Sequence, residues 1–246
     1  ELAINNAKIT LENKYSSKQN LLLELKEILK LEKLPRQIES FDISNLHGDY
    51  IVAGMCVAKD GIIHKGLSKR FKIKTVFKQD DPKCMTEVVS RRLKHSMEND
   101  KAFGKIPDVI FADGGITQIN AIKSAIQEYS LKIPVFGMVK DSRHRTKKLI
   151  NETGKEIEIT EDIMNFITNL QDEVHRVAIE YNRKLRDKET TKSALDDISG
   201  IGKKRKQELI KKFNSIENIK KADIGELTKI KGITEEMARK IKKELD

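Results

Sequence analysis

The sequence Ile-Glu-Ser-Phe-Asp-Ile-Ser, residues 38–44, predicts a short β-strand in which Asp42 stands between two apolar residues. A charge is rarely left in such surroundings without a partner, so Asp42 is a candidate for chemistry. The same arrangement returns in Pro-Asp-Val-Ile-Phe-Ala-Asp-Gly-Gly, residues 107–115, where an apolar strand ends at Asp113. Two carboxylates at the ends of apolar strands predict a divalent-metal site, because such ions favour hard oxygen ligands held on rigid backbone.

A third candidate ligand is His175, at the edge of the apolar face of a helix expected over residues 161–187. Each residue also has a structural interpretation: Asp42 as a strand end, Asp113 as a helix cap and His175 as a packed side chain. Their joint occurrence favours phosphodiester hydrolysis, in which a metal neutralises the phosphate and activates the attacking water. Nucleophilic catalysis and a P-loop fit less well, because the sequence contains neither Gly-x-Ser-x-Gly nor Gly-Lys-Ser/Thr.

The surrounding pattern predicts an α/β domain with the element order βββαβαβ. Alternation of strands and helices after residue 80 favours parallel pairing with crossover helices, and therefore a mixed sheet flanked by helices. A Lys-Asp-Gly hairpin turn is expected at residues 59–61. The strands are expected at residues 37–44, 50–58, 62–74, 107–113 and 133–140, the helices at about 80–97 and 116–130, a basic loop at 141–148 and a hairpin at 149–159.

The last fifty residues contain an internal repeat, in which residues 198–209 are echoed by residues 230–241. Each copy is a glycine turn that opens a helix, and glycine lets the backbone amides before a helix approach a phosphate closely. The first copy is basic and predicts DNA binding, with an ordinary helix connector as the alternative. The second copy replaces a glycine by Thr234 and fits a packing role. The candidate DNA-binding residues are Gly200, Gly202, Lys203, Lys204, Arg205 and Gly232, together with Arg143, Arg145 and Lys147 of the basic loop.

Composition limits the classes of protein that remain. The net charge of +10 favours a polyanionic partner, with nucleic acid first. The sequence has no apolar run long enough for a membrane span, and Cys56 and Cys84 lack CxxC spacing, so we expect a cytoplasmic protein without zinc or disulfides. A first residue other than Met suggests a fragment of something longer. The expected organisation is a helical lead-in at 1–34, a nuclease domain at 35–187, a linker at 188–194 and a DNA-binding domain at 195–246.

Several stretches together resemble the C-terminal half of UvrC, a component of the bacterial UvrABC excinuclease. These are residues 38–44 with Gly48, Asp80-Asp81 with Met85 and Arg91-Arg92, residues 107–115 with Gln118, residues 172–176, and the glycine hairpins. The resemblance implies an RNase H-like endonuclease domain followed by a tandem helix-hairpin-helix domain. It implies the 5′ incision at DNA lesions in nucleotide excision repair, with Asp42, Asp113 and His175 as the catalytic and metal-binding set. Asp81 matches a further acidic residue of catalytic importance, expected outside the ligand shell.

The same resemblance implies cofactors and partners. Mn²⁺ or Mg²⁺ is expected, with a preference for Mn²⁺ because an imidazole ligand suits manganese better. The partners would be double-stranded DNA with a lesion or bubble, UvrB in the full-length protein, and UvrA indirectly, with the chain itself a monomer. Two other functions stay open: a non-catalytic, structure-specific DNA-binding protein on a degenerate RNase H scaffold, and an RNase H acting on RNA–DNA hybrids.

Overall fold

The computed structural model describes residues 16–45, 51–76, 80–140, 146–196, 198, 200–213 and 216–245. Within these ranges it leaves out the side chains of residues 146, 147, 187–194, 196 and 203. The chain divides into two compact units, residues 1–182 and 183–246. Among the described helices, none is both long enough and apolar enough to cross a membrane.

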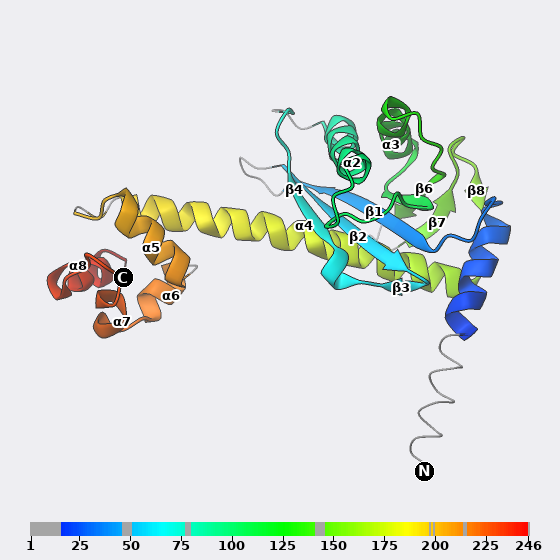
Figure 1. Ribbon diagram of the computed structural model, residues 1–246. Coiled ribbons are helices and arrows are strands. Elements are labelled where there is room, and N and C mark those ends of the chain that lie inside the picture. Colours follow the sequence, from blue (N-terminus) through cyan, green and yellow to red (C-terminus); the bar gives the residue numbers. More distant parts are fainter. Residues whose placement is uncertain are drawn as a thin grey trace, which may run out of the picture. The chain divides into compact units, whose positions relative to one another are not determined.

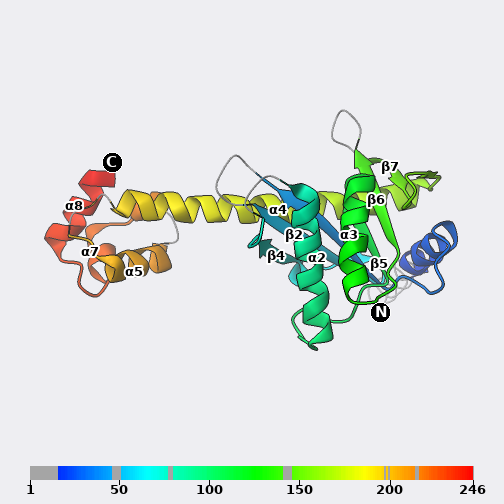
Figure 2. The same ribbon diagram turned by 90° about the horizontal axis from the view of Figure 1, so that it is seen from above.

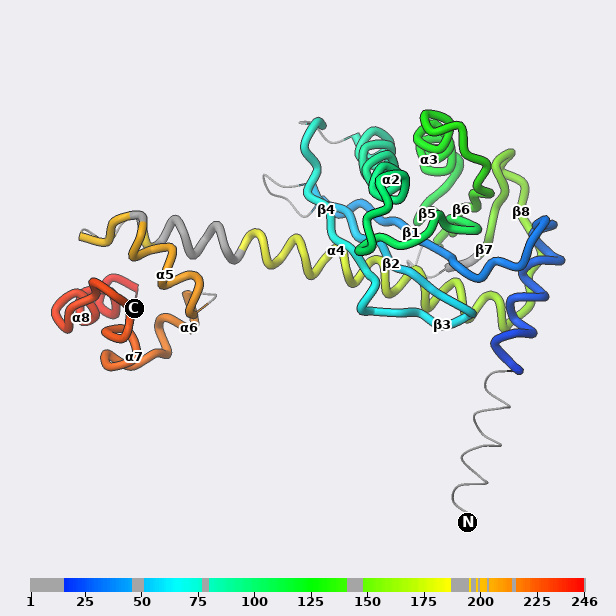
Figure 3. The backbone as a smooth tube through the Cα atoms, viewed as in Figure 1, coloured from blue at the N-terminus to red at the C-terminus, as the bar shows by residue number. Residues whose placement is uncertain are grey.

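The first unit is built on a mixed, eight-stranded sheet in the order β3-β2-β1-β5-β6-β7-β8, with β4 also paired to β2. The strands are β1 (Gln37–Ser44), β2 (Val52–Lys59), β3 (Ile62–Ile63), β4 (Lys69–Lys72), β5 (Val109–Asp113), β6 (Val135–Lys140), β7 (Thr146–Ile150) and β8 (Glu156–Ile157). Strands β1, β5 and β6 are parallel, and the outer strands are antiparallel. The predicted mixed sheet is confirmed, as is the predicted alternation of helices and strands from α2 to β6, and Figure 3 follows this path along the backbone.

Helices cover both faces of this sheet, as Figures 1 and 2 show. Helices α2 (Asp81–Met97) and α3 (Ile116–Glu128) lie on one face, where they bury a cluster that includes Phe41 and Ile110. Helix α4 (Glu161–Asp196) and the helix over residues 16–28 bury the other face, around Ile38 and Phe111. Because successive side chains of a strand point to opposite faces, the residues on the same face as Ile38 in β1 include Asp42.

The hairpin predicted at residues 59–61 is present. Both Asp60 and Gly61 have positive φ, as a two-residue turn between twisted strands requires. The single strand expected over 62–74 is instead two short strands separated by a 3₁₀ turn, η1 (Lys65–Leu67). Ile63 pairs with Ala58 of β2, and Lys69 pairs with Met55 of β2. The chain is therefore longer between these two pairs than β2 is, and the 3₁₀ turn accommodates the additional residues.

Two irregular segments expected from the sequence are regular in the structure. Residues 146–148, assigned to the basic loop, belong to β7 because they pair with β6. Residues 188–194, expected to be a linker, continue α4 to Asp196. The segment lacks apolar periodicity, but it also lacks glycine and proline, so nothing in it stops a helix that is already formed.

The second unit contains the end of α4, from Arg183 on, and short helices, all around one apolar core. The short helices are α5 (Lys203–Phe213), α6 (Ile216–Lys221), α7 (Ile224–Thr228) and α8 (Glu235–Leu245). Leu209, Leu227 and Ile241 are fully buried in this core, which shares no residue with the two clusters of the first unit. The unit therefore has a hydrophobic interior of its own.

Candidate active site

Asp42 and Asp113 lie at matching ends of two neighbouring parallel strands. In the β1–β5 ladder Phe41 stands beside Ala112, so the next residue on each strand is one of the two aspartates. Asp42 is buried, and Asp113 ends β5 immediately before Gly114. The carboxyl ends of parallel strands are where an open α/β sheet places its binding groups.

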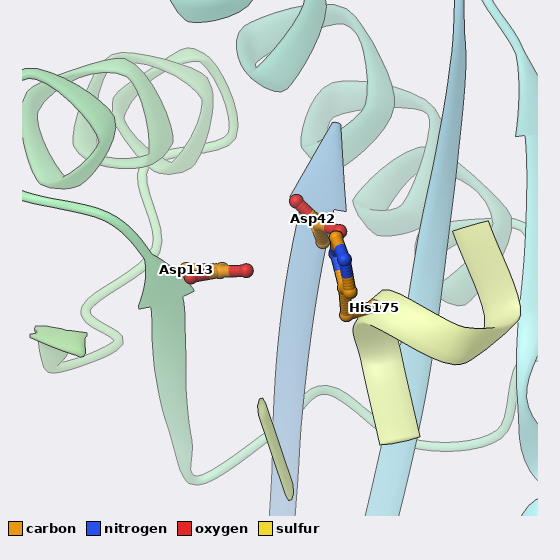
Figure 4. Close-up of side chains that lie close together, drawn as sticks. All are labelled: Asp42, Asp113 and His175. Atoms are coloured by element: carbon orange, nitrogen blue, oxygen red, sulfur yellow. The ribbon is translucent and has the colours of Figure 1, made fainter. Parts of the chain in front are cut away.

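His175 reaches the same point from α4 on the face of the sheet (Figure 4). Its Nδ1 lies 2.8 Å from Asp42 Oδ2, a distance at which the protonated nitrogen donates a hydrogen bond to the carboxylate. The close approach of α4 depends on Gly54, which stands opposite Asp42 in the β1–β2 ladder. A Cβ at Gly54 would lie 2.7 Å from the carbonyl oxygen of Val174, the residue before His175. The absence of a side chain at Gly54 thus sets how near the imidazole comes to the acids.

The two oxygens of Asp113 have separate partners that sequence reasoning missed. Gln171 Nε2 donates to Asp113 Oδ1 at 2.5 Å, and Lys140 Nζ donates to Oδ2 at 2.9 Å. A signal existed for Gln171, because it precedes His175 by one helical turn and so shares its face of α4. A signal also existed for Lys140, the last residue of the strand parallel to the one that ends at Asp113.

Asp113 does not cap the following helix. The N-cap of α3 is Gly115, and its amide donates to Gln118 Oε1 at 3.2 Å. Gly114 has φ +145°, and a Cβ there would meet the Gln118 side chain at 2.7 Å. The double glycine therefore gives the backbone a sharp turn and leaves the Asp113 carboxylate directed at Lys140 and Gln171.

The electrostatics of the three residues fit a cation. Burial, and the negative charge of Asp42 beside it, raise the pKa of Asp113. The hydrogen bond to Asp42 raises the pKa of His175. One ligand atom from each of the three residues lies within 4.8 Å of the other two. Two ligands at about 2.0–2.6 Å from one ion are separated by no more than about 5 Å, so these residues fit a divalent cation by both spacing and donor type.

Asp81 lies outside this three-residue cluster. It is the first residue of α2, after the N-cap Asp80, whose side chain accepts a hydrogen bond from the Lys83 amide. Among the described residues, Asp81 Oδ1 is buried with no hydrogen-bond partner. Its catalytic role stays a prediction.

The glycine hairpins of the second unit have matching geometry. Gly200 and Gly232 have φ +90° and +89°, and the turn amides of Ile201 and Ile233 donate to Ile198 and Ile230. Gly202 and Lys204 are exposed. Thr234, which replaces a glycine in the second copy, caps α8 by accepting from the Met237 amide. The repeat found in the sequence is therefore a repeat of backbone conformation as well.

Arg205 differs from the other candidate DNA-binding residues. Its Nη1 donates to the carbonyl oxygen of Gly200 at 2.9 Å, and its Nε lies 3.1 Å from where a Cβ of Gly232 would be. The guanidinium thus links the two hairpins. Arg143 and Arg145 lie outside the described residues, as do the side chains of Lys147 and Lys203.

A mixed sheet with two aspartates on neighbouring strands and a histidine from a helix that covers it, followed by paired glycine hairpins, defines a protein of the RNase H-like class with a tandem helix-hairpin-helix domain. Residues 26–179 match the family described as the UvrC RNAse H endonuclease domain, and residues 192–246 match the SAM-like helix-hairpin-helix tandem. The chain belongs to the UvrC family.

Curated relatives are similar in sequence over most of the chain. It is 45% identical over 236 residues to UvrABC system protein C of Acetivibrio thermocellus, covering 89% of this chain and 37% of the relative. It is 42% identical over 262 residues to UvrABC system protein C of Clostridium acetobutylicum, covering 98% of this chain and 42% of that relative. The chain thus spans about two fifths of these relatives. Among solved structures, Ciona intestinalis Endonuclease V in complex with inosine-containing DNA has a TM-score of 0.32 at 12% identity, covering 60% of this chain and 75% of that one.

Proposed function

We propose that the first unit hydrolyses a phosphodiester of DNA with a divalent cation held by Asp42, Asp113 and His175. The observation that carries this proposal is the meeting of the three side chains from β1, β5 and α4, elements far apart in the sequence. When bound, such an ion supplies neutralisation of the phosphate and activation of water. An imidazole beside two carboxylates favours Mn²⁺, with Mg²⁺ as the second choice.

Hydrogen bonds orient the side chains of the three candidate ligands before a cation binds. Gln171 and Lys140 fix both oxygens of Asp113, so its carboxylate has one orientation. Asp42 fixes the ring of His175 through Nδ1. A charged imidazole of His175 has to lose one proton before it can bind the cation, so cation binding and proton release are coupled.

The second unit would hold the DNA through its backbone. The amides of the two glycine turns and the charge of Lys204 suit phosphates and ignore base identity. Family membership extends the proposal to the 5′ incision at lesions in nucleotide excision repair. It also extends to UvrB as the recruiting partner, UvrA indirectly, a cytoplasmic location and a monomeric chain. The division into a nuclease domain at 35–187 and a DNA-binding domain at 195–246 is part of the same proposal.

Nicking of a lesion-containing duplex tests the function. The chain is incubated with the duplex and Mn²⁺, with UvrB added in a parallel reaction, and Asp113→Asn is expected to reduce incision about 10³-fold or more. Asp162→Ala, which removes an exposed acid from the first turn of α4, is the matched control. Incision by Asp113→Asn at the wild-type rate refutes the proposed mechanism.

Nicking, together with a calorimetric titration and an RNA–DNA hybrid substrate, distinguishes the endonuclease from the two alternative functions. A non-catalytic DNA-binding protein binds the duplex, cuts nothing, and shows no Mn²⁺ binding that His175→Ala weakens in a calorimetric titration. An RNase H cuts an RNA–DNA hybrid in preference to the lesion-containing duplex. The complete set of three ligand side chains at one point supports the endonuclease over the first alternative, and the appended hairpin pair supports it over the second.

A further inference from the structure

Lys140 places a positive charge directly on a candidate metal ligand. Its Nζ lies 2.9 Å from Asp113 Oδ2, and about a quarter of its side chain is exposed while that of Asp113 is nearly covered. Gln171 already occupies the other oxygen. Each oxygen of Asp113 therefore has a partner, and one of the two partners is a cation supplied by the chain.

Regular alternation along β6 brings Lys140 to Asp113, and an irregularity in the pairing of β6 with β7 lies beside it. Met138 pairs with Asp113 across the parallel β5–β6 ladder, so Lys140 lies two residues beyond it and on the same face of the sheet. The register of β6 with β7 shifts between Val139 and Lys140. A β-bulge adds an unpaired residue and redirects the neighbouring side chains, and such bulges are common next to active sites.

An ammonium and a divalent cation compete for the same oxygen. Both are attracted to the carboxylate of Asp113, and like charges repel strongly at this range. The four-carbon stem of lysine lets the ammonium leave the carboxylate while its backbone stays fixed. When a cation binds Asp113, a DNA phosphate at the site can bind the displaced ammonium of Lys140 in place of the carboxylate.

We propose that Lys140 neutralises Asp113 in the cation-free protein and moves to a non-bridging oxygen of the scissile phosphate when cation and DNA bind. This inference rests on the proposed function, since it names a further residue that handles the substrate. The competing role is purely structural, with Lys140 only fixing the orientation of Asp113.

Lys140→Met separates the two roles, because methionine keeps much of the side-chain length and removes the charge. Loss of a competing cation is expected to tighten Mn²⁺ binding about three- to tenfold in a calorimetric titration. A structural role predicts weaker Mn²⁺ binding. Lys132→Met, which changes an exposed lysine shortly before β6, is the matched control and is expected to bind Mn²⁺ as the wild type does.

DNA affinity gives a second readout that does not depend on catalysis. With Ca²⁺ present, Lys140→Met is expected to bind a duplex about fivefold more weakly, with the salt-dependence slope lower by about 1. With EDTA it is expected to bind as the wild type does, because Lys140 then stays on Asp113. An equal defect in Ca²⁺ and in EDTA, or no defect in Ca²⁺, overturns the proposal.

Nicking completes the test. Lys140→Met is expected to lower kcat about 10²-fold and to raise KM by no more than the about fivefold loss of DNA affinity, and Lys140→Arg is expected to restore part of kcat by restoring the charge. Wild-type incision rates in Lys140→Met overturn the inference. Absence of nicking by the wild-type chain contradicts the proposed function instead, and the Mn²⁺ and Ca²⁺ comparisons still decide the role of Lys140.

Discussion

Gly54 is the residue on which the position of His175 depends most directly. A Cβ at Gly54 would lie 2.7 Å from Val174 O and 2.8 Å from Ala178 N, both backbone atoms of α4. Backbone cannot rotate away as a side chain can, so Gly54→Ala has to push the helix off the sheet. We expect a loss of about 1–3 kcal/mol in the free energy of unfolding, together with weaker Mn²⁺ binding.

Urea denaturation and calorimetric Mn²⁺ titration measure both effects of Gly54→Ala. Gly66→Ala is the control, because nothing lies within 4 Å of a Cβ there. It is expected to change the free energy of unfolding by no more than about 0.5 kcal/mol. A Gly54→Ala protein that is less stable but binds Mn²⁺ normally contradicts the link between this glycine and the site.

The pair of His175 and Asp42 gives the metal-free protein a defined pH dependence. Asp42, and more weakly Asp113, raise the pKa of His175 above 6.5, whereas its partial burial and Lys140 act against them. The charged imidazole is therefore favoured by folding, and its stabilisation is fully present below pH 6.5 and lost as pH rises through the raised pKa. Mn²⁺ affinity changes in the opposite sense and increases over the same range, because the proton competes with the ion.

An NMR titration of the His175 ring in the presence of EDTA measures that pKa. Asp42→Asn is expected to return it toward 6.5, and His175→Gln identifies the signal. A His175 that titrates at or below 6.5 in the metal-free wild type contradicts the expectation.

At the scale of single residues, the sequence predicts the acids and the histidine but not the groups that hold them. Asp42 and Asp113 stand out because each is a carboxylate in an apolar strand. Lys140 and Gln171 offer weaker signals, a position at the end of a strand and a position one helical turn before His175, and only the pairing of β6 with β5 and the rotation of α4 bring them to Asp113. Those two features are set by tertiary packing, which no local pattern encodes.

Strand β1 and helix α2 are joined by a buried ion pair. The side chains of Arg92 and Glu39 are both fully buried, and Arg92 Nη2 donates to Glu39 Oε1 at 2.6 Å and to the Lys105 carbonyl at 2.7 Å. Desolvation raises the pKa of Glu39 despite the arginine. Arg92→Met leaves that acid without its partner, so we expect a loss of about 3–5 kcal/mol in the free energy of unfolding, measured in urea.

Two further variants test whether the instability of Arg92→Met comes from a buried charge without a partner. Arg91→Met removes the neighbouring, partly exposed arginine and is expected to cost about 1 kcal/mol or less. The double variant Glu39→Leu with Arg92→Met removes both charges and is expected to recover much of the stability. A double variant as unstable as Arg92→Met alone contradicts the buried-charge explanation.

The two glycine hairpins are linked by Arg205, which sets it apart from the exposed Lys204. Lys204→Ala is expected to reduce DNA affinity and to lower the salt-dependence slope by about 1, because one phosphate contact is lost. Arg205→Ala is expected to reduce affinity with an unchanged slope, because it loosens the hairpins without removing a contact to DNA. Fluorescence anisotropy over a salt series measures both, and an equal drop in slope for Arg205→Ala shows a direct phosphate contact instead.

At the scale of elements, the local patterns predict well wherever an apolar run, an apolar helical face or a turn sequence marks the element. The strand over 37–44, the turn at 59–61 and the crossover helices all follow from periodicity and turn residues. The interruption of the third strand at η1 does not, because it depends on how many residues of β2 are available for pairing. The helical course of residues 188–194 escapes prediction because these residues lack an apolar face, the property on which the prediction relies.

The whole molecule has separate hydrophobic interiors in its two units, which predicts separate stabilities. Leu209 is fully buried in the core of the second unit. Leu209→Ala is expected to cost that unit about 2–5 kcal/mol and to lower only one of two calorimetric transitions. Mn²⁺ binding by the first unit is expected to stay unchanged, and its loss in the same variant contradicts the independence of the two cores.

The hydrogen bond that completes the site joins residues 133 positions apart, from β1 to α4. Strands β1 and β5 are synthesised well before α4, so a growing chain displays two acids long before the imidazole exists. Contacts between such distant positions also form late in folding, because a long loop has to close first. On the proposed function, an unfinished or half-folded chain lacks a ligand and cannot break the genome of the cell that is making it. Nuclease activity therefore begins only after α4 has been synthesised and has packed against the sheet.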